Sequence, residues 1–137
     1  MTGRKVTVIR QKTTIDADPD FVFNAYVDPR RHADFTGSPA SGSGRVGGKF
    51  AAWDGYISGR YTALVKGKKI VHEWTTTVWP EGAPPSEVEI TLRKVGKKTE
   101  LTMVHSKVPA EQADEYAQGW IDYYWEPLKK YAKENSS

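Results

Sequence analysis

Near its C-terminal end the chain carries a stripe of large apolar side chains at helical spacing. The stripe consists of Ala113, Tyr116, Ala117, Trp120, Tyr124, Leu128 and Tyr131, which recur three or four residues apart. This period places the seven side chains on one face of a helix. Acidic residues occupy the first turns of the segment and lysines the last, as the helix dipole favours. We therefore expect one long amphipathic helix over residues 110–133, whose apolar face the rest of the fold must cover.

Two residues inside this segment should shape the helix. Pro127 has no N–H, so it removes the hydrogen bond to the carbonyl of Tyr123 and should bend the helix there. Gly119 stands just before Trp120 and has no Cβ, which would let a neighbouring backbone or a bulky side chain come close. The helix is thus predicted to be bent near its end and closely approached near its middle.

The N-terminal part of the chain predicts a strand followed by two short helices. β-Branched residues dominate residues 6–15, and Asp18 then offers an N-cap with Pro19 at the first helical position. Asp28 and Pro29 end this first helix. A further turn or two of helix is expected as far as Phe35.

A loop and five strands are predicted between these helices and the C-terminal one. Residues 36–48 are so rich in Gly, Ser and Pro that we expect a mobile loop, and loops of this length are often functional. Asp54-Gly55 signals a hairpin turn in which Gly55 takes a positive φ, and prolines keep the loop 80–85 out of the sheet. The strands are expected at about 46–53, 56–66, 69–79, 86–95 and 98–107.

These elements predict an α+β fold with a single domain over residues 1–137. A curved antiparallel sheet of about six or seven strands should surround the long helix, with aromatic side chains of the strands alternating toward it. Such rings with polar tips pack imperfectly, which predicts a partly wet, mostly apolar cavity beneath the loops 36–48 and 80–86. The predicted cavity residues are Phe50, Tyr61, His72, Trp74, Met103, His105, Tyr116, Trp120 and Tyr124. For Trp120 and Tyr124, simple core packing is the alternative.

The histidines raise the question of catalysis or metal binding. His72 and His105 could act as a general base pair or as metal ligands, with Glu73 or Asp54 completing a site. The predicted interior lacks the carboxylate cluster that such sites usually need. We therefore expect both histidines to be structural or ligand-orienting groups, His32 to be solvated, and the protein to have no catalytic residue, metal or cofactor.

Composition narrows the compartment and the partners. The chain has no cysteine, which excludes disulfides, zinc knuckles and thiol chemistry. Residues 1–10 lack the apolar core of a signal peptide and the apolar runs are too short for a bilayer, so we expect a cytoplasmic protein without membrane association. The net charge of +3 is spread over predicted turns and a helix end, and the rings face inward. No nucleic-acid partner is expected.

Several segments together resemble one protein family. They include RVGGKFAAWDGYISG at residues 45–59, GWIDYYWEPL at residues 119–128, and shorter pieces at 15–23, 28–29, 70–74, 79–80, 86–88 and 99–105. This combination is similar to the homologues of the activator of the ninety-kilodalton heat-shock chaperone's ATPase (AHSA-like), within the START-like, or SRPBCC, helix-grip superfamily. The resemblance implies an order of β-α-α-β₅-α, as in birch-pollen-allergen-like proteins, with a cavity between sheet and helix.

Three functions follow from these observations. The first is a non-enzymatic domain that binds a small hydrophobic molecule in the cavity. The second is an interaction module for a chaperone or another stress-response partner, as the resemblance implies, although we expect the chain to lack the additional N-terminal domain of full-length activators. A small cyclase-like or hydrolase-like enzyme comes last, because no acid–base pair can be named.

Overall fold

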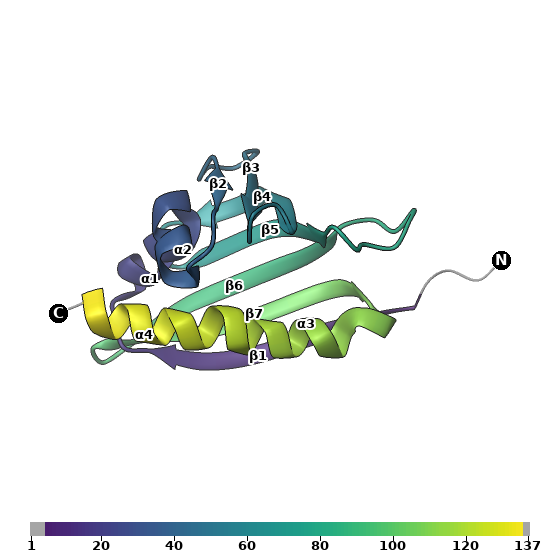
Figure 1. The fold of residues 1–137 in the computed structure, drawn as a ribbon. Coiled ribbons are helices and arrows are strands. Elements are labelled where there is room, and N and C mark those ends of the chain that lie inside the picture. Colours follow the sequence, from purple (N-terminus) through teal and green to yellow (C-terminus); the bar gives the residue numbers. More distant parts are fainter. Residues whose placement is uncertain (1–4, 136–137) are drawn as a thin grey trace.

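A computed structural model describes residues 5–135 of the chain (Figure 1). Seven antiparallel strands form one sheet in the order β1-β7-β6-β5-β4-β3-β2. The strands are β1 (Val6–Ile15), β2 (Ser41–Gly42), β3 (Lys49–Ala52), β4 (Ile57–Val65), β5 (Lys69–Thr76), β6 (Ser86–Val95) and β7 (Lys98–Pro109). The helices are α1 (Pro19–Val27), α2 (Pro29–Thr36), η1 (Ala110–Gln112), α3 (Ala113–Trp120), η2 (Ile121–Trp125) and α4 (Glu126–Asn135).

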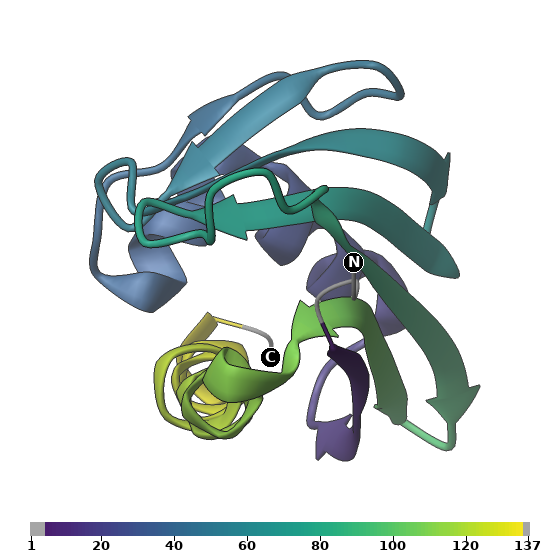
Figure 2. The ribbon, with the colours of Figure 1, turned by 90° about the vertical axis from the view of Figure 1, so that its right-hand side faces the viewer.

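The sheet curves around the C-terminal helix, which runs without interruption from η1 to α4. Viewed along the helix, the strands arch over one side of it (Figure 2). Gln11 on β1 links the sheet to this helix, since its amide donates to the carbonyl of Ala117 and accepts from the Trp125 indole. The predicted α+β helix-grip fold is therefore confirmed.

The two short helices begin where the sequence predicts. Asp18 accepts a hydrogen bond from the N–H of Asp20, and Asp28 accepts one from the N–H of Arg30. Each cap is followed by a proline at the first helical position, where a missing N–H costs nothing. Both helices lie near the α4 end of the long helix (Figure 1), and Phe35 of α2 contacts the ring of Tyr131.

The loop predicted at 36–48 contains one short strand that the sequence pattern does not reveal. Ser41 and Gly42 pair with Ala51 and Phe50 and so extend the sheet by β2. Gly42 has a φ of 132°, and a Cβ there would lie 2.5 Å from the carbonyl oxygen of Lys49. The glycine that makes this segment look irregular is thus what allows its close pairing.

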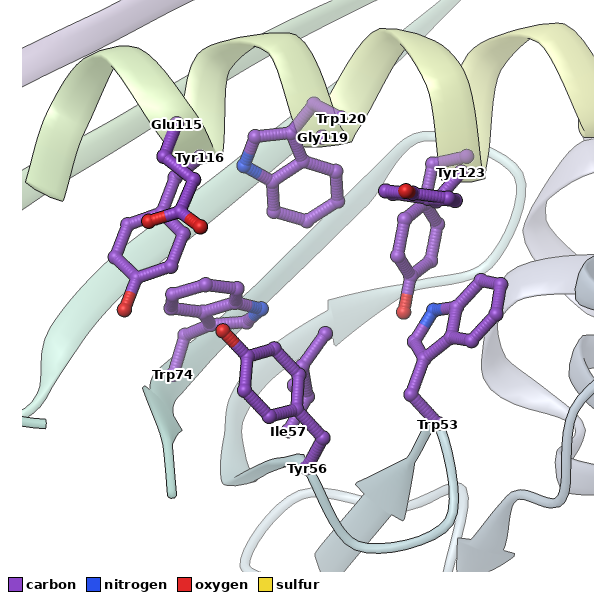
Figure 3. A pocket seen from close by; sticks show the side chains of 10 residues that line it. Trp53, Tyr56, Ile57, Trp74, Glu115, Tyr116, Gly119, Trp120 and Tyr123 are labelled. Carbon is purple, nitrogen blue, oxygen red and sulfur yellow. The ribbon is translucent and has the colours of Figure 1, made fainter. Parts of the chain in front are cut away.

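The turn between β3 and β4 is tighter than expected. Gly55 has the predicted positive φ, at 87°. The two residues before it also lie in the left-handed region although they are not glycines, Trp53 with φ 54° and Asp54 with φ 56°. A left-handed residue other than glycine costs about 1–3 kcal/mol. This turn therefore holds the Trp53 side chain in place at an energetic cost, on the side of the sheet that faces the long helix (Figure 3).

The long helix contains a π-helical turn, η2, just before Pro127. The N–H of Glu126 bonds to the carbonyl of Ile121, five residues back, instead of the usual four. The expected disturbance near Pro127 therefore takes the form of a wide turn that precedes the proline. Gly119 is not closely approached as expected, because a Cβ there would meet only Tyr123, at 3.7 Å.

Candidate functional site

An aromatic cavity of about 310 Å³ lies between the long helix and the sheet (Figure 3). The helix contributes Glu115, Tyr116, Gly119, Trp120, Tyr123 and Tyr124. The sheet and the β3–β4 turn contribute Trp53, Tyr56, Ile57 and Trp74. Small-molecule sites are commonly concave and mostly apolar in this way, with a volume of roughly 300 Å³ or more.

The rings around this cavity hold one another in place. Trp120 lies 4.8 Å from Tyr124 and 6.0 Å from Trp74, measured between ring centroids. Trp74 meets Tyr116 edge to face at 4.9 Å, and Trp53 meets Tyr123 in the same manner at 5.4 Å. These tilted and edge-to-face pairs stabilise the wall beyond simple area burial.

The structure brings four of the nine predicted cavity residues into this site: Trp74, Tyr116, Trp120 and Tyr124. Phe50 and Tyr61 line a separate, much narrower hollow of about 10 Å³ beside α1 and β2. His72, Met103 and His105 point inward as predicted but are fully enclosed by other side chains. Alternation along a strand gives the inward face, whereas the position of an opening along that face depends on the curvature of the sheet.

Six lining residues are absent from the prediction. Trp53 and Tyr56 belong to the turn between β3 and β4, whereas Ile57 is the first residue of β4, on the face that alternation along the strand turns inward. Glu115, Gly119 and Tyr123 flank the apolar stripe of the helix. An apolar stripe drawn one residue wider along the helix would have included these three residues, because the neighbours of Tyr116 and Trp120 line the same groove.

Trp74 carries the unexplained polar atom of the site. Its side chain is 4% exposed, and its Nε1 is the one buried side-chain nitrogen or oxygen in residues 5–135 without a hydrogen-bond partner. Buried donors are nearly always paired, and an unpaired one costs about 1–3 kcal/mol. Such a group in the wall of a cavity is a candidate for contact with a ligand.

Tyr116 and Glu115 form the polar side of the cavity. The Tyr116 hydroxyl donates to Gln112 Oε1 at 2.9 Å and accepts from Thr76 Oγ1 at the same distance. Burial raises the pKa of Tyr116, and the negative charge of Glu115 adds to that rise. The Tyr116 hydroxyl is therefore neutral at physiological pH and fully engaged, while the exposed Glu115 carboxylate brings negative charge to the cavity.

His105 supports the cavity wall from behind. The Trp120 indole N–H donates to His105 Nδ1 at 3.1 Å, which places the ring proton on Nε2. That N–H donates to Ser86 Oγ, and the Ser86 hydroxyl donates to the carbonyl of Trp74. Burial lowers the pKa of His105 to about 3, so the ring is neutral and positions Trp120.

A second buried network joins the other two histidines, and it corrects the expectation for His32. His32 was expected to be solvated but is only 5% exposed, because α2 packs its inner face against the long helix. Its Nδ1–H donates to the Tyr26 carbonyl, and its Nε2 accepts from the Tyr124 hydroxyl at 2.9 Å. His72 Nε2 likewise accepts from the Tyr26 hydroxyl at 2.8 Å. All acceptors and donors are matched only if both rings are neutral.

Replacing Tyr124 by phenylalanine should reveal this network. The substitution leaves buried His32 Nε2 without its donor, so Tyr124→Phe should lower the free energy of unfolding by about 2 kcal/mol. Urea denaturation at pH 7.5 measures the change. Tyr123→Phe is the matched control, because that side chain is 57% exposed and its substitution should alter stability by less than about 0.5 kcal/mol. Equal stability of the two variants would contradict the role assigned to the Tyr124 hydroxyl.

Among residues 5–135, no group of three or more His, Cys, Asp or Glu side chains could hold a metal ion. Five titratable side chains line the cavity, Tyr56, Glu115, Tyr116, Tyr123 and Tyr124, and burial raises the pKa of Tyr116 and of Tyr124. In the described part of the chain, no helix is long and apolar enough to cross a bilayer.

The fold and the aromatic cavity define a helix-grip domain. The chain belongs to the family described as activator of Hsp90 ATPase homolog 1-like protein, whose sequence profile matches residues 16–133. This confirms the resemblance found in the sequence motifs.

Two mammalian activators are similar to most of this chain. The activator of 90 kDa heat shock protein ATPase homolog 1 of Homo sapiens is 36% identical over 124 residues, and that of Mus musculus is 34% identical over 124 residues. Each match covers 89% of this chain but only 36% of the relative, so the chain spans about a third of their length. The crystal structure of an HSP90 activator from Plasmodium falciparum has a TM-score of 0.86 at 25% identity and covers 96% of this chain and 97% of that one.

Proposed function

We propose that this domain binds an Hsp90-type chaperone and stimulates its ATPase activity. The observation that carries the proposal is the extent of the match: the segment shared with the named activators covers 89% of this chain. The similarity therefore includes the sheet, both short helices and the long helix, rather than one motif. The proposal assigns the activity to this shared segment, so it can be tested directly with the chain described here.

The test is the ATP turnover of a purified Hsp90-type chaperone at increasing concentrations of this protein. We expect a rise in rate that saturates and that an inhibitor of the chaperone ATPase abolishes. Two charge-reversed variants probe the surface: Lys97→Glu with Lys98→Glu in the β6–β7 hairpin, and Lys66→Glu with Lys68→Glu in the β4–β5 hairpin, all exposed positions. Loss of stimulation in one pair only would locate an acidic contact on the chaperone. No stimulation at saturating protein would refute the proposal.

The cavity supports a second function, the binding of a small hydrophobic molecule. Its volume of about 310 Å³ and its aromatic wall fit a ligand of one or two rings. A ligand that binds only the folded chain raises the melting temperature, by mass action. We expect small aromatic compounds to raise it and native mass spectrometry to detect a bound molecule after purification. A melting temperature that no compound in a broad apolar panel changes would contradict this function.

A further inference from the structure

The cavity differs in charge from the rest of the protein. The chain has 20 lysines and arginines and a net charge of +3, yet none of the ten lining residues is basic. The only charged group among them is Glu115, which makes no ion pair within residues 5–135. An anionic ligand would meet this carboxylate and find no cation to compensate it.

The shape of the wall favours flat ligands. Figure 3 shows the Trp74 and Trp120 rings on opposite sides of the cavity, with Tyr123 and Trp53 at its other end. Because the Trp74 and Trp120 ring centroids are only 6.0 Å apart, a flat ligand would lie against these two rings rather than between them. There it gains offset or edge-to-face contacts, whereas a flexible alkyl chain would lose rotational freedom on entering. The electron-rich faces of the rings also attract cations and repel anions.

The unpaired indole N–H of Trp74 adds a polar requirement for a ligand. Trp74 Nε1–H is shielded from solvent and has no acceptor among the described residues. In Figure 3 this nitrogen lies on the side of the ring that faces Trp53, away from Glu115. Because the nitrogen is shielded, a ligand acceptor at this end would have to displace a neighbouring side chain in order to satisfy it, and an acceptor-free hydrocarbon would leave it unpaired.

We propose that the cavity selects a flat aromatic ligand that accepts a hydrogen bond from Trp74 Nε1–H and carries no negative charge, and that it rejects fatty acids and other anions. The proposal rests on the second function above, ligand binding, and specifies its chemistry. Neutral or cationic heteroaromatic compounds are the class that meets all three features: the ring walls, the unpaired donor and the lone carboxylate.

Three probes of similar shape test the proposal at pH 7.5: quinoline, which has an acceptor nitrogen, naphthalene, which has none, and 2-naphthoate, which is an anion. Binding is measured by calorimetry on the full chain. We expect 2-naphthoate to bind more weakly than both neutral probes. Glu115→Gln, at an exposed position, should strengthen 2-naphthoate binding about threefold relative to naphthalene binding.

The hydrogen bond is isolated by a second substitution. In Trp74→Phe, the ratio of quinoline affinity to naphthalene affinity should fall about fivefold to tenfold, because only quinoline uses the indole N–H. Should Trp74→Phe fail to fold, the indole N–H proton resonance of Trp74 in the unaltered protein replaces it: quinoline should move this signal downfield and naphthalene should not.

The outcomes distinguish ligand binding itself from the proposed selectivity. If none of the three probes binds, ligand binding itself is refuted. If they bind but 2-naphthoate binds as tightly as quinoline, or the Trp74 signal responds equally to quinoline and naphthalene, the proposed selectivity is overturned while ligand binding stands.

Discussion

Lowering the pH from 7.5 to 5 should reduce the free energy of unfolding by about 4 kcal/mol through His72 and His105 alone. Burial lowers the pKa of His72 to about 4 and that of His105 to about 3. In the unfolded chain both titrate near 6.5. Between pH 6.5 and about 4, the unfolded state therefore binds protons that the folded state excludes. Stability is complete above pH 6.5 and is lost as the pH falls below it.

The same argument extends to His32, whose pKa burial also lowers. Each histidine contributes about 1.4 kcal/mol per pH unit inside its window. The hydrogen bonds explain why no ring accepts a second proton: His72 Nε2 and His32 Nε2 each accept from a tyrosine, and His105 Nδ1 accepts from Trp120. Protonating His105 Nδ1 would set two donors against each other, because the Trp120 indole can only donate. Protonating His72 or His32 would force the tyrosine hydroxyl to accept and to turn its own proton elsewhere in a buried place.

Urea denaturation at half-unit pH steps measures this dependence. The control is His105→Gln, which keeps a donor and an acceptor toward Ser86 and Trp120 but cannot titrate. This variant should be less stable at pH 7.5 and should take up one proton fewer on unfolding at pH 5. If the native protein takes up no protons on unfolding between pH 6 and 5, apart from those of its carboxylates, the histidines titrate freely and the buried networks are wrong.

Gly59→Ala should be the most damaging glycine-to-alanine substitution in the sheet. We expect it to lower the free energy of unfolding by about 3 kcal/mol. A Cβ at this position of β4 would overlap the carbonyl oxygen of Glu73 and lie 2.8 Å from the Phe50 ring. The Glu73 carbonyl belongs to β5 and is held by the neighbouring strands, so it cannot move aside cheaply. The φ of Gly59 is not in the left-handed region, which makes the expected loss one of space alone.

Gly119→Ala provides the contrast. Its Cβ would meet only Tyr123 Cδ2, at an ordinary 3.7 Å, within a helix where alanine is favoured over glycine by up to about 1 kcal/mol. Thermal unfolding of the two variants should therefore shift in opposite directions. Equal melting temperatures for Gly59→Ala and the native protein would show that β4 and β5 are not as close as described.

The order of elements could be predicted because the patterns that specify it are local. The period of the apolar stripe predicts the helix that begins at Ala110, Asp18-Pro19 predicts the start of α1, and Asp28-Pro29 predicts its end. His32 could not be placed in the same way, since Arg30, Arg31 and Asp34 surround it and suggest a solvated segment. Its spacing of three residues from buried Phe35 was the available signal.

The cavity was only partly predictable for a different reason. Helical period and strand alternation assign a side chain to a face, and they did so correctly for Trp74, Trp120 and Tyr124. They do not say where along that face the packing is incomplete, because this depends on how strongly the sheet bends. One such bend lies between Tyr61 and Ala63, where β4 shifts its register against β5.

The π-helical turn η2 separates the long helix into two parts that can change independently during evolution. Before it, Tyr116, Gly119 and Trp120 line the cavity, and after it, Leu128 and Ala132 are fully buried in the core. Deleting one residue within 121–125 would restore a regular helix and rotate its last turns by about 100°, carrying Leu128 away from the interior. Point substitutions among the cavity-lining residues, by contrast, do not rotate the last turns of the helix. Substitutions before η2 can therefore reshape the cavity while Leu128 and Ala132 keep the end of the helix anchored in the core.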